Sequence, residues 1–175
     1  MAAKVLLTGR PGCGKTTAIR KTVAALGAIA GGFCTEEIRV EGSRVGFRVT
    51  DLHTNRHGVL AHVSRKGAPR VGKYGVDVAE FDRIGAAALR DALHREGCIV
   101  IDEIGKMELF SSAFPQAVVE VLDSGHPVLA TIARSRHPFL AAVRERPDVR
   151  IIELTAANRD ELPRQFVELL SRESA

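Results

Sequence analysis

The stretch GRPGCGKT, residues 9–16, decides how this chain folds. It matches the pattern G-x-x-x-x-G-K-[ST], the phosphate-binding P-loop, and it lies between an apolar run at 4–8 and a segment of helix formers at 15–26. A strand, a glycine-rich turn and a helix in that order direct backbone N–H groups and the positive end of the helix at one point. The pattern therefore predicts a phosphate-binding turn directly after the first strand.

Each position of this motif has a chemical reason. Glycines let phosphate oxygens approach the backbone, the side chain of Lys15 reaches the β- and γ-phosphates, and the hydroxyl of Thr16 is offered to Mg²⁺. Mg²⁺ is therefore the expected cofactor. The predicted nucleotide contacts are the motif and the residue after it: Gly9, Arg10, Pro11, Gly12, Cys13, Gly14, Lys15, Thr16 and Thr17.

The rest of the chain alternates between apolar runs and segments with helical periodicity. Continuous apolar runs separated by helices predict a mostly parallel sheet covered by helices on both faces, which is an α/β fold. A last helix is expected to begin at Asn158, where Glu161 completes a capping box. The other strands are expected at 98–101, 128–132 and 149–154, and the other helices at 78–96, 113–122 and 138–146.

Between residues 36 and 63 the pattern changes to an alternation of polar and apolar residues. Segments 37–40 and 45–49 flank a turn at 41–44, which predicts a β-hairpin, and 58–63 adds a third strand. No repeat or linker-like stretch interrupts the chain. We therefore expect a single domain, residues 1–175, in which this insert forms antiparallel strands at one edge of the sheet.

The composition excludes several classes of protein. Of the 175 residues, 45% are hydrophobic and 26% are charged, which is typical of a folded globular chain. No apolar run reaches the ~18 residues of a membrane span, and the N-terminus does not resemble a signal peptide. Three dispersed cysteines, Cys13, Cys34 and Cys98, indicate reduced thiols. We expect a cytoplasmic protein with no membrane partner, and we favour a monomer.

The charge is basic but scattered. The chain has 25 basic and 21 acidic residues, for a net charge of +4. Nucleic-acid-binding proteins gather their basic residues in a patch or stripe, and no such run is present here. A polyanionic substrate such as a nucleoside triphosphate accounts for the excess equally well. A nucleic-acid partner therefore stays an alternative that the charge pattern does not support.

Two adjacent acids end the strand predicted at 98–101. Asp102 stands where a P-loop protein holds Mg²⁺, directly or through a water molecule, and Glu103 follows it. Neighbouring residues that leave a strand diverge, so one carboxylate can face the metal while the other faces water at the γ-phosphate. We therefore predict Glu103 as the catalytic base. By analogy, P-loop proteins with this adjacent glutamate are mostly hydrolases with an extra strand between the two motif strands.

The segment DEIGKME at 102–108 resembles a known family, the small nucleoside triphosphatases of many thermophiles, also known as cancer-related nucleoside triphosphatases. The resemblance covers nearly the whole chain; Cys13 departs from it, since the family usually has an aliphatic residue there. It implies a P-loop NTPase fold and Mg²⁺-dependent hydrolysis of ATP, GTP, CTP and UTP to diphosphate and phosphate, with little choice of base. Further agreement lies at 32–39, 46–47, 71–74, 76–78 and 158–160.

Weaker candidates have two interpretations each. Thr131, at the end of the strand at 128–132, is placed to contact the γ-phosphate or is simply a residue that favours strands. Lys106 is a candidate for the cation that stabilises the transferring phosphate, with a surface lysine as the other interpretation. Arg134 and Arg136 are rival candidates for that cation. Phe33, Phe47 and Tyr74 either stack on a base or pack in the core.

Three functions fit these residues. The first is a Mg²⁺-dependent nucleoside triphosphatase. The second is a small-molecule kinase on the same fold, which needs an acceptor pocket and a mobile arginine-rich lid. The third is a nucleotide-dependent switch associated with RNA or DNA, in which hydrolysis only times binding. The adjacent acids favour the first.

Overall fold

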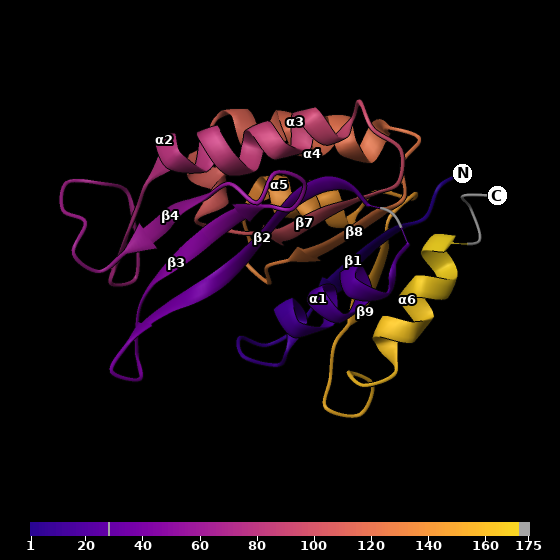
Figure 1. Cartoon of the computed structure of the whole chain (residues 1–175), viewed down its shortest axis with the longest axis horizontal. Coiled ribbons are helices and arrows are strands. Elements are labelled where there is room, and N and C mark those ends of the chain that lie inside the picture. Colours follow the sequence, from indigo (N-terminus) through magenta and orange to yellow (C-terminus); the bar gives the residue numbers. More distant parts are fainter. Residues whose placement is uncertain (28, 172–175) are drawn as a thin grey trace.

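The computed structural model of the chain describes residues 1–27 and 29–171. Its centre is a nine-stranded sheet in the order β5-β6-β4-β3-β2-β7-β8-β1-β9 (Figure 1). The strands are β1 Lys4–Thr8, β2 Ile29–Val40, β3 Ser43–Asp51, β4 His57–His62, β5 Arg70–Val71, β6 Tyr74–Val76, β7 Cys98–Ile104, β8 Val128–Ile132 and β9 Arg150–Glu153. The helices are α1 Lys15–Ala25, α2 Val78–Phe81, α3 Ala87–Ala92, α4 Ala113–Asp123, α5 Pro138–Arg144 and α6 Leu162–Ser171, with a short π-helix η1 Asp82–Ala86 and a short 3₁₀ helix η2 Glu108–Phe110.

One half of the sheet is parallel. Strands β7, β8, β1 and β9 pair in parallel, and β8 lies between β7 and β1. The carboxyl ends of these strands meet at one edge, which is where α/β sheets bind their ligands. The predicted α/β fold is confirmed, and so is the extra strand between the strand before the P-loop and the strand before Asp102.

The sheet is covered on both faces, as the continuous apolar strands predict. Alternate residues of β1 point to opposite sides: Leu6 belongs to a core with α3, α4 and α5, whereas Val5 and Leu7 belong to a second core with α1 and α6. Figure 1 shows α2, α3 and α4 above the sheet and α1 and α6 below its parallel part. Helices α1 and α6 do not extend under the antiparallel strands.

Strand β2 joins the two halves. Its beginning, Ile29–Phe33, pairs in parallel with β7, and its later part pairs antiparallel with β3. A side chain at Gly32, whose φ is +106°, would lie 1.9 Å from the carbonyl oxygen of Val100, so only glycine allows the two strands this approach. The antiparallel strands continue through β6 to Val76, beyond the stretch 36–63 indicated by the sequence pattern.

The helix predicted at 78–96 is present in three pieces, α2, η1 and α3, and its regular part ends at Ala92. The prediction for the last helix is wrong at its start. Asn158 does not cap α6, because its side chain is bonded to the preceding loop, accepting from the backbone N of Thr155 and donating to the carbonyl of Glu153. The helix begins at Leu162, with Pro163 in its first turn, where the missing N–H costs nothing.

Among the described residues, none of the helices is long and apolar enough to cross a membrane.

Candidate functional site

The P-loop wraps around the ammonium group of Lys15. Gly12 and Gly14 have φ values of +75° and +102°, which turn the backbone at the start of α1. The Nζ atom of Lys15 donates to the carbonyls of Gly9 and Arg10 at 3.1 and 3.2 Å. The cation is therefore held at the mouth of the loop by weak neutral acceptors, which a phosphate oxygen would replace.

Asp102, in β7, is the centre of a buried polar cluster. Its side chain is 2% exposed, and its Oδ1 accepts from the hydroxyls of Thr131 at 3.2 Å and Thr16 at 3.5 Å. The backbone N of Thr35 in β2 donates to Oδ2 at 3.5 Å. Burial, and secondly the neighbouring charge of Glu103, raise the pKa of Asp102 to about 6.

Two further carboxylates converge beside Asp102. A side chain at Gly105 would lie 3.1 Å from an oxygen of Glu103 and 3.1 Å from an oxygen of Glu108, so the glycine leaves room for both. Burial raises the pKa of Glu103, although Lys15 opposes this shift. Burial, and secondly Glu103, raise the pKa of Glu108 well above its ordinary range. Sequence reasoning gave no role to Glu108; its only signal was its place in the 102–108 segment.

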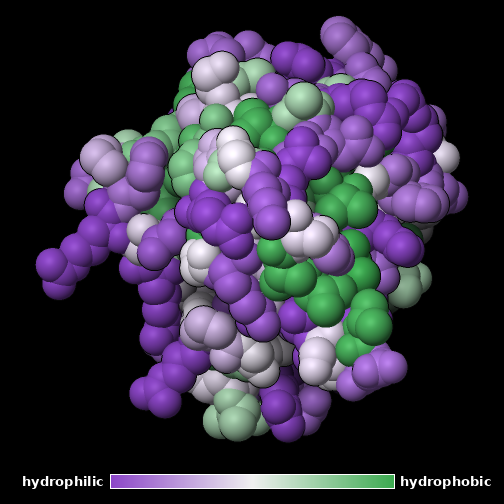
Figure 2. Space-filling view, turned by 90° about the vertical axis from the view of Figure 1, so that its left-hand side faces the viewer, coloured by the Kyte–Doolittle hydropathy of each residue, from purple (hydrophilic) through white to green (hydrophobic). Residues whose placement is uncertain are grey.

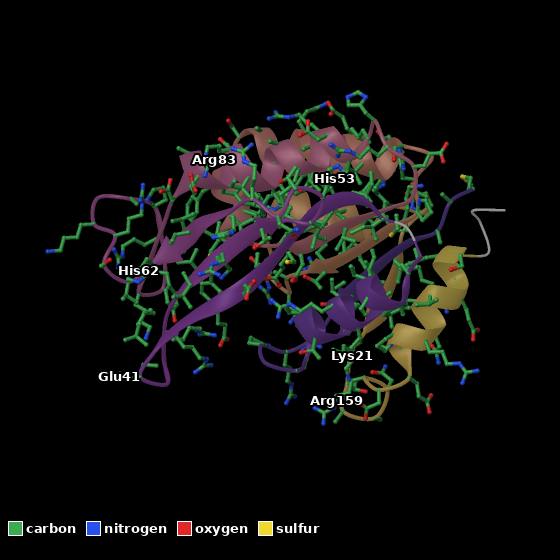
Figure 3. The ribbon with its side chains drawn as sticks, in the orientation of Figure 1. Lys21, Glu41, His53, His62, Arg83 and Arg159 are labelled. Atoms are coloured by element: carbon green, nitrogen blue, oxygen red, sulfur yellow. The ribbon has the colours of Figure 1, made fainter. Side chains whose placement is uncertain are left out.

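These groups open into one cleft of about 1070 Å³ that runs from the P-loop to the antiparallel strands. It lies between α1 and the β2–β3 hairpin, two elements that Figure 3 marks with Lys21 and Glu41. Arg10 and Cys13 do not line the cleft, and the backbone N of Cys13 donates to the Arg10 carbonyl. The predicted site residues that line it are Gly9, Pro11, Gly12, Gly14, Lys15, Thr16, Thr17, Asp102, Glu103, Lys106 and Thr131.

The candidate cations differ in their partners. Lys106 is exposed and lines the cleft, and within residues 1–27 and 29–171 it forms no ion pair or side-chain hydrogen bond. Arg134 also lines the cleft, but it is paired with Glu153. Arg136 is exposed and does not line it. Of these three side chains, only that of Lys106 both lines the cleft and is free of a carboxylate partner among the described residues.

The far wall of the cleft is formed by the antiparallel strands. Nothing in the sequence pattern predicted that their side chains come together in one wall. The rings of Phe47 and Tyr74 lie 5.1 Å apart, and the guanidinium of Arg44 lies over both, at 5.2 and 5.6 Å. Arg44 donates to the hydroxyl of Tyr74 and to Glu37, at 2.9 and 3.0 Å. Phe33, by contrast, is fully buried in the core.

The oxygen atoms around Asp102 suit Mg²⁺. This cation prefers hard oxygen ligands and is usually bound through one or two carboxylates plus the phosphates of the substrate. Asp102 and Thr16 supply a carboxylate and a hydroxyl within 3.5 Å of each other, beside the P-loop. The described residues contain no group of three or more His, Cys, Asp or Glu side chains arranged for a metal of its own. The donor set fits a cation that arrives with a triphosphate.

Known proteins are similar to this chain over almost its whole length. Nucleoside-triphosphatase THEP1 of Thermofilum pendens is 50% identical over 172 residues, covering 95% of this chain and 94% of that protein. The THEP1 protein of Thermotoga petrophila is 44% identical over 95% of this chain and 92% of its own length.

Two solved structures have the same fold. The crystal structure of THEP1 from the hyperthermophile Aquifex aeolicus matches with a TM-score of 0.87 at 39% identity, over 97% of this chain and 99% of that one. The solution structure of a human cancer-related nucleoside triphosphatase matches with a TM-score of 0.80 at 38% identity, over 98% of each chain. A family described as NTPase matches residues 4–167, and this chain belongs to that NTPase family.

Proposed function

We propose that this protein hydrolyses nucleoside triphosphates to diphosphates and phosphate in a Mg²⁺-dependent reaction with low base specificity. One observation carries the proposal: a P-loop lysine, the buried Asp102 and the adjacent, half-buried Glu103 open into the same cleft. The names of the THEP1 relatives and the NTPase family support it.

Triphosphate binding begins at the P-loop. The N–H groups around Gly12 and Gly14 and the amino end of α1 bind phosphate oxygens, and Lys15 exchanges its carbonyl partners for the β- and γ-phosphates. A charged acceptor makes a stronger hydrogen bond than a neutral carbonyl, so the exchange favours binding. Thr17, which lines the cleft in the first turn of α1, is placed against the same phosphates.

Asp102 and Thr16 would hold the cation. When bound, Mg²⁺ offsets negative charge that develops on the phosphate oxygens. The carboxylate of Asp102 is kept in place by the Thr131 hydroxyl and the Thr35 backbone. We therefore assign Thr131 to the orientation of Asp102 rather than to direct contact with the γ-phosphate.

Glu103 is the proposed base. Its raised pKa lies closer to neutral pH than that of an ordinary glutamate, which suits a group that accepts a proton from water. As the water oxygen bonds to the γ-phosphorus, its proton passes to Glu103 and the bond to the β,γ-bridging oxygen breaks. The unpaired Lys106 is placed at the cleft to stabilise the charge on the transferring phosphate.

A kinase is less well supported. A kinase of this size needs a mobile arginine-rich lid, but α5 is a regular helix whose start is capped by His137. Arg144, in its last turn, donates to the carbonyls of Ser135 and Ala133 and is therefore held in place.

We also propose a cytoplasmic location. The support for it is the three free cysteines, Cys13, Cys34 and Cys98, which are dispersed and form no disulfide.

Phosphate release from ATP, GTP, CTP and UTP, with and without Mg²⁺ and without any acceptor, tests the proposal. We expect release from all four and loss of release without Mg²⁺. Lys15→Ala should weaken both triphosphate binding and turnover, because it removes the cation of the P-loop. Phosphate release that requires an added acceptor would instead establish a kinase.

A further inference from the structure

The cleft extends beyond the residues that address the triphosphate. Binding sites for small organic ligands measure about 300 to 1,000 Å³, and this cleft measures about 1070 Å³. The P-loop, Asp102, Glu103 and Thr131 account for one end of it. The other end is lined by residues of β2 to β6 that the proposed hydrolysis does not use: Glu37, Arg44, Phe47, Leu60, Val71 and Tyr74.

The sheet order places this second end beyond the γ-phosphate. Lys15 and Thr16 face the β- and γ-phosphates, so the nucleoside extends away from Asp102 and its strand β7. Strand β3, which carries Arg44 and Phe47, lies two positions past β7 on the side opposite β1. Neighbouring strands are about 4.8 Å apart, so β3 lies roughly 10 Å past the strand of Asp102. The base therefore does not reach this wall.

Arg44 is fixed in place there. Phe47 and Tyr74 support its guanidinium, while the Tyr74 hydroxyl and Glu37 accept from Nε and from one terminal nitrogen. Its other terminal nitrogen has no hydrogen-bond partner among the described residues. An arginine whose fork is already ordered loses little entropy on binding an anionic oxygen.

The residues around Arg44 indicate which other chemical groups a ligand of this end of the cleft would carry. Leu60, Val71 and the two rings form an apolar wall, and Figure 2, which faces this end of the molecule, shows apolar surface beside hydrophilic side chains. A planar ring would bury its faces against the apolar wall while its anionic group accepts from the terminal nitrogen of Arg44 that has no other partner.

We propose that this compartment binds a second small molecule, a planar aromatic compound that carries an anionic group, at the same time as the triphosphate occupies the P-loop. The proposal rests on the proposed function only for the placement of the triphosphate. A nucleoside monophosphate is the simplest compound of this class, and AMP is the probe.

The experiment measures AMP binding by equilibrium dialysis to protein saturated with Mg²⁺ and the non-hydrolysable β,γ-imido analogue of ATP. We expect AMP to bind the saturated protein, and adenosine and inorganic phosphate each to bind about tenfold or more weakly, because each lacks half of the recognised groups. Lys15→Ala should lose the analogue and keep AMP. Displacement of AMP by the analogue would overturn the proposal, since AMP would then occupy the P-loop.

Variants locate the compartment. Arg44→Gln should weaken AMP binding about tenfold or more, whereas Arg48→Gln, on the same strand but outside the cleft, should bind AMP like the parent. Tyr74→Phe keeps the ring and removes the hydroxyl, which accepts from Arg44 Nε and donates to the Arg44 carbonyl, so a smaller loss of about two- to fivefold is expected. Circular dichroism confirms that each variant is folded.

Equal AMP affinity for Arg44→Gln and Arg48→Gln would overturn the proposal, and so would equal binding of adenosine and AMP. Absence of hydrolysis together with Arg44-dependent AMP binding would instead overturn the proposed function and leave this inference in place. The two proposals therefore fail separately.

Discussion

The pKa values of acidic residues are shifted in opposite directions in the parallel and antiparallel halves of the sheet. In the parallel half, Asp102, Glu103 and Glu108 are crowded together, and burial raises the pKa of all three. In the antiparallel half, Glu37 is exposed, and hydrogen bonds from Arg44 and then Arg39 lower its pKa. Two buried carboxyls and a half-buried one, with one lysine nearby, make a site that gains from an added cation, whereas Glu37 is already paired with two arginines.

The largest effect is expected at the acids of the parallel half. Glu103→Gln keeps the size of the side chain but removes the group that accepts a proton, so hydrolysis should fall about 10²- to 10⁴-fold. Nucleotide affinity should hold or rise, because one negative charge near the triphosphate is lost. Phosphate release and Mg²⁺-nucleotide binding measure the two effects. As a control, Glu120→Gln on the exposed side of α4 should hydrolyse like the parent.

Parental hydrolysis by Glu103→Gln would show that Glu103 is not the base. Another group, or the γ-phosphate itself, would then have to activate the water.

One lysine from each half of the sheet can be replaced by alanine to compare the loss of the same positive charge. Lys106→Ala, at the cleft, should lower turnover about tenfold or more with little change in nucleotide affinity, because the cation acts mainly on charge that develops in the transition state. Lys66→Ala, in the loop between β4 and β5, lies outside the cleft and should have no effect. Steady-state kinetics on both variants measure the difference. If the two variants behave alike, Lys106 is a surface lysine.

The two halves should also differ in their response to pH. Asp102 must be ionised to hold a cation, and its pKa is raised to about 6, so kcat/KM should fall about tenfold per pH unit below about pH 6. The pKa of Glu37 is lowered, so that carboxylate stays ionised across this range. A pH profile of kcat/KM at saturating Mg²⁺ measures this. A profile that stays flat down to pH 4.5 would contradict the role of Asp102.

A rise in pH should lower the stability of the metal-free protein, whereas it should raise the activity. The pKa of Asp102 is higher in the folded chain, at about 6, than its ordinary 3.8, so the folded state holds the proton more tightly. The free energy of unfolding of the metal-free protein should therefore fall, by up to about 3 kcal/mol from this group, as the pH rises from about 4 to about 6. Urea unfolding across this range measures the change, and added Mg²⁺ should reduce it.

The smallest effect is expected from the base of the substrate. The proposed contacts with the triphosphate address phosphates and Mg²⁺, and the proposed position of the γ-phosphate separates the base from the aromatic wall. We therefore expect the kcat/KM values for ATP, GTP, CTP and UTP to agree within about tenfold, since stronger discrimination requires ~1.4 kcal/mol or more of dedicated contacts. A preference of about a hundredfold for one nucleotide would mean that a base is read within the cleft.

Several features of the site could be predicted from the sequence because they are local. The strand, turn and helix around the P-loop follow from an apolar run, three glycines and a helical segment that are adjacent in the chain. The position of Asp102 and Glu103 after an apolar run is local as well. The start of α6 was missed because a capping pattern at Asn158 competes with the loop that precedes it, and the loop takes the side chain.

Other features depend on residues that are far apart in the sequence. Thr131 reaches Asp102 because β8 and β7 are neighbours, and Arg44 reaches Tyr74 because the intervening strands fold back across the sheet. The buried position of Glu108, beside Glu103, is likewise a result of packing. No spacing in the sequence indicates these contacts.

The sequence by itself determined the order of the elements, the phosphate-binding turn and the acids near the end of β7, since backbone conformation and hydrophobic periodicity act over a few residues. The tertiary structure decided which of these elements meet. It placed the wall formed by Arg44, Phe47 and Tyr74 in the same cleft as Lys15, and it set the pKa values of the acids. Burial and charge proximity exist only after distant segments have packed together, and this is why they could not be read from the order of the residues.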